Sequence, residues 1–83
     1  MIMELKPGRY FNVRCVIAYL FDHQLDGISD KLYKVPMHEG EHGVYYRFDE
    51  VSNFLKGVGA IGHLKLMEST LVWVEIHDFK PVI

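Results

Sequence analysis

Cysteine, proline and long apolar runs are scarce in this chain. Its 83 residues include one cysteine, Cys15, and three prolines. A lone cysteine forms no internal disulfide, which excludes a disulfide-stabilised secreted scaffold and favours a reducing compartment. Residues 1–6 carry charge and lack the apolar core of a signal peptide. We therefore expect a cytoplasmic protein.

Membrane spans and blocks of like charge are also missing. The longest nearly apolar run, residues 15–21, is far shorter than the roughly 20 residues that span a bilayer. Nine basic and eleven acidic residues give a formal net charge of -2 and are spread without runs. Such a distribution creates no field that attracts bulk nucleic acid or an anionic membrane. We expect no membrane partner, and the charge does not favour nucleic acid.

Apolar material, in contrast, is plentiful. Hydrophobic residues make up 49% of the chain and aromatic residues 13%, which is enough for one core in a small domain. No repeat, low-complexity tract or linker divides the sequence. We expect a single domain over residues 1–83.

Residues 10–20 alternate in a way that is typical of a strand. One set of alternate residues is apolar throughout and the other becomes apolar halfway along, as in a strand that enters the middle of a sheet. This segment is therefore predicted to be the central strand. Residues 21–30 concentrate turn formers such as Asp26-Gly27, which predicts a surface loop.

Residues 31–48 predict a hairpin with Gly40-Glu41 as a two-residue turn. This register is favoured because it matches three apolar pairs on one face: Met37 with Val44, Val35 with Tyr46, and Tyr33 with Phe48. Proline has no amide hydrogen to donate, so Pro36 indicates that its strand lies at a sheet edge.

The second half of the chain predicts one helix and two further strands. Asp49 is a good N-cap, apolar residues recur at helical spacing after it, and Gly57 or Gly59 ends the helix; the buried stripe is Val51, Phe54, Leu55 and Val58. Residues 63–79 predict a hairpin around a three-residue loop at 68–70, with Leu64 opposite Val74 and Leu66 opposite Val72.

The predicted fold class is therefore α+β. About five antiparallel strands have one short helix between the third and fourth, in the order β-β-β-α-β-β. Two architectures fit this order: a sheet with one helix packed on it, or a small barrel like the oligonucleotide- and oligosaccharide-binding (OB) fold.

Residues His38-Glu39-Gly40-Glu41-His42 match the letter pattern of the zinc proteases. In those enzymes the two histidines bind zinc from one helical face and the glutamate activates water. Here Gly40 interrupts the segment and Pro36 precedes it, which disfavours a helix. The hairpin makes this segment a turn, so His38 and His42 remain only weak candidates for metal ligands.

No other pattern indicates catalysis. No serine lies in a nucleophile-elbow motif, and the glycines of residues 57–62 follow the predicted helix instead of opening one. Cys15 falls on the inner strand face, where a cysteine acts as a small apolar residue. We expect neither enzymatic activity nor a cofactor.

Two surface patches are candidate partner-binding sites. The first is the outer face of the last predicted hairpin, where tryptophan is a frequent interface anchor unless the helix or the N-terminal arm covers it: Trp73, Lys65, His63 and Glu75. The second combines an aromatic ring with cations that repel one another unless an anionic partner lies between them: Tyr45, Arg47, Lys34 and Arg14.

These features favour a small non-enzymatic module that binds another protein through its sheet face or an exposed strand edge. It would act as an inhibitor or adaptor of a larger complex, and a virus-borne accessory protein would have the same features. The alternative is an OB-like domain that binds single-stranded nucleic acid through the second patch, and a third is a small metal-binding protein. Exposed edge strands also favour a homodimer.

Overall fold

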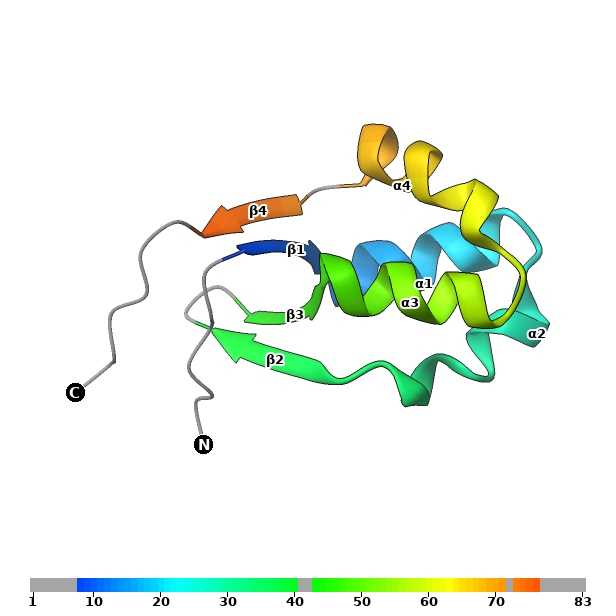
Figure 1. The fold of residues 1–83 in the computed structure, drawn as a ribbon, viewed down its shortest axis with the longest axis horizontal. Helices are drawn as coiled ribbons and strands as arrows, with labels where there is room; N and C mark the ends of the chain where they lie inside the picture. The colour runs from blue at the N-terminus through cyan, green and yellow to red at the C-terminus, as the bar shows by residue number, and fades with distance from the viewer. Residues whose placement is uncertain (1–7, 41–42, 72, 77–83) are drawn as a thin grey trace.

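A computed structural model of the chain describes residues 8–40, 43–71 and 73–76, with side chains described up to Leu71. Strands, α-helices and short 3-10 turns alternate along these residues (Figure 1). In chain order they are β1 (Gly8–Asn12), α1 (Val13–Asp22), α2 (Asp26–Ser29), η1 (Leu32–Lys34), β2 (Met37–Gly40), β3 (Gly43–Arg47), α3 (Phe48–Gly57), η2 (Ile61–His63), α4 (Leu64–Thr70) and β4 (Trp73–Ile76).

The strands form one antiparallel sheet in the order β2-β3-β1-β4. Among the described residues, β1 and β3 are therefore interior strands, and β2 and β4 are the edges. Figure 1 shows the strands gathered at one end of the molecule and the helices at the other. This separation arises because β1 runs directly into α1 and β3 runs directly into α3.

The predicted order of five strands around one helix is wrong. Four strands are present in the part of the chain that the structure describes, and helices α1, α2 and α4 occupy segments that were predicted as strand or loop. Neither a sheet covered by a single helix nor an OB-like barrel is formed. The error at α1 falls where apolar residues are too dense for their period to identify one element.

The predicted central strand ends at Asn12, where α1 begins. β1 is indeed interior, but the Asn12 side-chain oxygen accepts hydrogen bonds from the backbone N–H groups of Arg14 (2.9 Å) and Cys15 (3.3 Å). This is an N-cap, which satisfies donors that the first helical turn leaves free. The buried residues of α1 follow helical spacing: Val16, Tyr19 and Leu20. The predicted loop over 21–30 likewise contains the end of α1 and the single turn of α2.

The predicted hairpin between β2 and β3 is present, but its register is offset by two residues. Met37 lies opposite Tyr46 instead of Val44, and Gly40 lies opposite Gly43. A two-residue offset leaves every side chain on the same face, but Val44 now lies opposite Glu39, so the apolar pairing that favoured the predicted register does not set the observed one. Residues 32–34 form η1 and Phe48 begins α3, which removes the predicted pair of Tyr33 with Phe48. The edge position indicated by Pro36 is confirmed for β2.

The predicted helix is confirmed as α3, which ends at Gly57 and is followed by Gly59 with a φ of +75°. Its buried stripe contains Val51 and Leu55. The predicted N-cap is wrong, because Arg47 occupies that position without a side-chain cap. Asp49 instead lies in the first turn, where the helix dipole stabilises a carboxylate. It also forms an ion pair with Arg47 at 2.9 Å.

The last predicted hairpin is wrong. Residues 64–70 form α4, and only Trp73–Ile76 form a strand. Met67 is fully buried, and Leu64 and Leu71 pack against the core beside it, which is a helical spacing of three and four. Leu66, predicted to share a strand face with Leu64, is 43% exposed. β4 pairs with β1, where Trp73 lies opposite Phe11.

The core covers one face of the sheet, and tyrosines fill the other. Phe11 and Tyr46 belong to the main cluster, to which the helices and turns also contribute: Val16, Tyr19, Leu20, Leu32, Val35, Val51, Leu55, Ala60 and Met67. On the opposite face Tyr10 and Tyr45 are 0% and 5% exposed, with their rings in edge contact at 6.4 Å. Both faces of β1 are therefore buried. No helix within the described ranges has the length and apolarity to cross a membrane.

We expect Asn12→Ala to lower the free energy of unfolding by about 1 kcal/mol, the usual effect of removing an N-cap. Urea unfolding followed by circular dichroism measures this change. Asn12→Asp keeps an acceptor oxygen at the same position and serves as the control, with stability close to that of the unmodified chain. Equal stability of the alanine variant would show that the cap does not set the start of α1.

Candidate functional site

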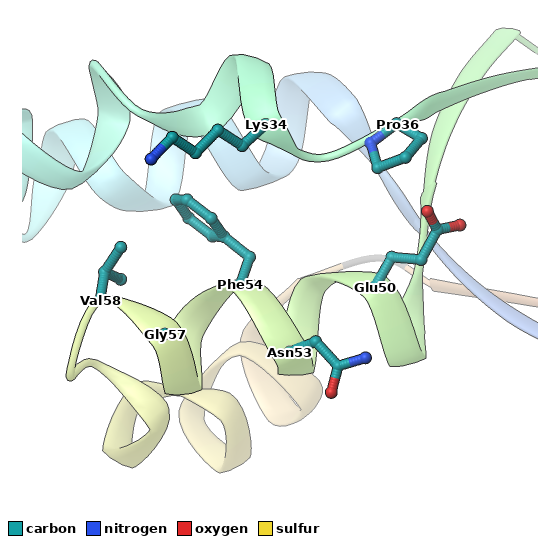
Figure 2. Close-up of a pocket in the computed structure, with 7 residues that line it drawn as sticks. All are labelled: Lys34, Pro36, Glu50, Asn53, Phe54, Gly57 and Val58. Atoms are coloured by element: carbon teal, nitrogen blue, oxygen red, sulfur yellow. The ribbon is translucent and has the colours of Figure 1, made fainter.

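A groove of about 440 Å³ lies between the segment Lys34–Pro36 and helix α3 (Figure 2). Phe54 and Val58 give it an apolar lining, while Lys34 and Glu50 contribute opposite charges. Figure 2 shows the Phe54 ring pointing from α3 toward the Lys34 side chain. Asn53, Gly57 and Pro36 complete the lining. An apolar surface with a few polar groups is typical of sites that bind ligands or side chains.

The groove lies next to the start of β2, because Pro36 lines it and Met37, the following residue, begins the strand. Within the described residues, no strand pairs with the outer side of β2. In an antiparallel pair, every second residue directs its N–H and C=O away from its partner strand. Since Gly40 and Gly43 form the last pair of the hairpin, the Glu39 N–H is expected to point to the open edge.

A side-chain hydrogen bond holds β2 against α3. His38 Nε2 lies 2.7 Å from Glu50 Oε1, and both side chains are mostly buried. The His38 ring also makes an edge contact with the buried Tyr10 ring, with centroids 5.8 Å apart. One wall of the groove is therefore fixed to the other at the end where β2 begins. Lys34, whose charge is opposite to that of Glu50, is exposed on η1.

A second polar cluster joins α1 to η2. The Tyr19 hydroxyl lies 2.7 Å from His63 Nδ1, and His23 Nδ1 lies 2.9 Å from the Tyr19 carbonyl oxygen. The His23 ring stacks on the Tyr19 ring at 3.9 Å. Because Tyr19 is only 4% exposed, burial raises the pKa of its hydroxyl above the ordinary 10.0. The cluster fixes the position of η2, and no nucleophile or charged carboxylate adjoins it in these contacts.

The residues of the first predicted patch lie on three different elements. His63 belongs to η2 and contacts Tyr19, Lys65 is exposed on α4, and Trp73 and Glu75 belong to β4. The Trp73 and Glu75 side chains are outside the described part of the structure, so their role in partner binding stays a prediction. The hairpin face that was expected to unite these residues is not formed.

The second predicted patch is also divided. Tyr45 is buried, which leaves no exposed ring at this position for a base to stack on, and Arg47 forms an ion pair with Asp49. Lys34 lies on the groove, and Arg14 is exposed on α1. Lys34 therefore does not face Arg47 across a strand pair, and the predicted repulsion between them has no basis in this fold.

The zinc-protease pattern does not lie on a helix, because Met37–Gly40 form β2. Of the two weak metal-ligand candidates, His38 pairs with Glu50, and His42 is outside the described residues. Across ranges 8–40, 43–71 and 73–76, no three or more histidine, cysteine or acidic side chains gather as a metal site. Cys15, predicted to lie on a buried strand face, is a half-buried free thiol on α1.

One exposed apolar surface was missed from the sequence. Phe21 is 73% exposed and Ile17 is 46% exposed, and a spacing of four places them on one side of α1. Arg14 and Ala18 on the same side are also exposed. We call these four residues the outer face of α1. The signal for this helix was the capping residue Asn12 together with the spacing of Val16, Tyr19 and Leu20.

Comparison of the chain with models of protein families, with curated proteins and with solved structures finds no match. The arguments for a function therefore rest on the geometry described above.

The buried tyrosines predict a loss of stability at high pH. Burial raises the pKa values of Tyr19 and Tyr46, so the unfolded chain loses these protons first. The stability contribution is therefore intact below about pH 10 and falls as the pH rises above it. Urea unfolding between neutral and strongly alkaline pH should show this fall, and Tyr19→Phe should make it shallower. An unchanged slope in Tyr19→Phe would contradict the assignment to Tyr19.

Proposed function

We propose that this chain is a small non-enzymatic module that binds an extended segment of another protein along the open edge of β2. One side chain of that segment enters the groove beside α3. The observation that carries the proposal is the position of the groove next to the start of the open-edged strand, where Pro36 lines the groove and Met37 begins β2. A module of this kind acts as an adaptor or an inhibitor by occupying its partner's segment.

The backbone of β2 supports binding by strand addition. An extended segment that pairs with an edge strand gains main-chain hydrogen bonds, while pockets for alternate side chains provide specificity. The first residue of β2, Met37, is 54% exposed. The strand contains no proline, and the one proline nearby, Pro36, precedes it. The usual protection of an edge by an internal proline is therefore missing in β2.

The groove supports a preference for an apolar side chain next to an acidic one. Phe54 and Val58 form an apolar surface, on which an aliphatic or aromatic side chain is removed from water. Glu50 is already engaged by His38. Lys34 has no ion-pair partner in the described part of the chain, so it is the charge that remains for a carboxylate of the bound segment.

Selection of peptides from a phage-displayed random library on the immobilised full chain tests the proposal. Selected peptides should combine apolar and acidic residues in extended sequences. Glu39→Pro removes the outward N–H without removing a hydrogen bond to β3, and should weaken binding of a selected peptide by about tenfold or more. Glu39→Ala, the matched control, should stay within about twofold.

Lys34→Glu tests the contribution of the groove separately from that of the β2 edge. It should weaken binding of acidic peptides about tenfold or more and leave circular dichroism unchanged, because Lys34 is exposed. Failure to select any peptide, or equal affinity of Glu39→Pro and Glu39→Ala, would contradict binding at the β2 edge.

A further inference from the structure

Helix α1 has a second apolar side in addition to the one in the core. Val16, Tyr19 and Leu20 are buried, whereas Phe21 and Ile17 on the outer face are 73% and 46% exposed. The two outer residues lie one helical turn apart and therefore form a continuous apolar strip. An exposed aromatic ring in line with an exposed aliphatic chain is typical of a contact surface. This surface lies on α1, whereas the groove next to β2 is lined by residues of α3.

The charges of α1 are placed in the unfavourable sense for an isolated helix. The first turn contains the exposed cation Arg14 and no acidic residue, and the last turn contains the exposed Asp22 and no basic residue. The helix dipole favours the reverse arrangement. Neither Arg14 nor Asp22 forms an ion pair in the described part of the chain. A partner helix running in the opposite direction would make both charges favourable.

A second copy of α1 is such a helix. Arg14 and Asp22 are eight residues apart, or about 12 Å along the axis, so they do not pair within one helix. Ala18 lies midway between them. A two-fold axis passing near Ala18 places Arg14 of each copy beside Asp22 and the carbonyl end of the other copy. The small Ala18 side chain lets the two axes approach to about 8 Å, the close end of helix packing.

We propose that the outer face of α1 is a self-association surface, on which two copies of this chain pack α1 against α1 in an antiparallel, two-fold symmetric pair. Phe21 and Ile17 of each copy are removed from water in the contact, and Arg14 of each copy pairs with Asp22 of the other. Such an arrangement is an isologous interface, in which one patch is complementary to itself.

The contact is small. One face of a short helix buries less than the roughly 800 Å² per partner of a standard stable interface. We therefore expect a reversible dimer that forms with rising concentration, with a dissociation constant in the micromolar range or weaker. Because charged pairs contribute, its affinity should fall as the salt concentration rises.

Sedimentation equilibrium of the full chain from micromolar to millimolar concentration tests the proposal, with single and double charge reversals as the variants. Arg14→Asp and Asp22→Arg alone should each weaken dimerisation by about tenfold or more, since like charges then meet at both ends. The double variant R14D/D22R should restore it. Each reversal also improves the fit of charge to the helix dipole, so dimer loss with unchanged circular dichroism would not reflect unfolding.

Phe21→Ser should also abolish the dimer, whereas Glu39→Pro at the β2 edge should leave it intact. A chain that stays monomeric to millimolar concentration would overturn the proposal. Failure of R14D/D22R to restore the dimer would overturn the antiparallel pairing, and loss of the dimer in Glu39→Pro would assign it to the strand edge. The unmodified chain could instead be monomeric and capture a different protein from its native cell, with Phe21→Ser failing to capture it. In that case the other protein binds the outer face of α1, and self-association is excluded.

Discussion

The conversion of strand into helix at Asn12 is the constraint on which the rest of the structure depends. By capping α1, Asn12 ends β1 after a few residues and confines the sheet to one end of the molecule. β3 passes into α3 in the same abrupt way, so the two interior strands each lead directly into a helix. The helices then complete a core that so short a sheet does not provide alone. The groove exists because α3 extends past the start of β2.

Polar side-chain contacts connect the secondary-structure elements at three places. His38 with Glu50 fixes β2 to α3, Tyr19 with His63 fixes α1 to η2, and Arg9 links β1 to Glu68 of α4 at 2.8 Å. Two of these contacts join a strand to a helix, and the contact of Tyr19 with His63 joins two helical elements. In a domain of this size apolar burial is limited. Such pairs therefore contribute to the relative orientation of the elements as well as to the stability of the fold.

Elements were predicted correctly from the sequence where the spacing of apolar residues fits only a helix or only a strand. Helix α3 was correct because its apolar residues fit helical spacing alone, and the β2–β3 hairpin was correct apart from a register that side-chain alternation does not specify. α1 was missed because residues 13–20 are apolar in nearly every position, which satisfies strand and helix spacing alike. Of the candidate residues, Lys34 lies on the groove and Arg14 on the outer face of α1. Both surfaces depend on helix placement, so local patterns did not locate them.

The pairing of β1 with β4 also sets the order in which the fold is completed. Gly8 lies opposite Ile76, so this interior strand acquires its second neighbour only after almost all of the described chain has left the ribosome. Until then, one side of β1 carries open backbone groups next to some of the most apolar residues of the chain, a state prone to mispairing. The hairpin of β2 and β3 and the helix α3 involve only local contacts and can form earlier. Completion of the sheet is therefore expected to follow formation of the β2–β3 hairpin and of α3.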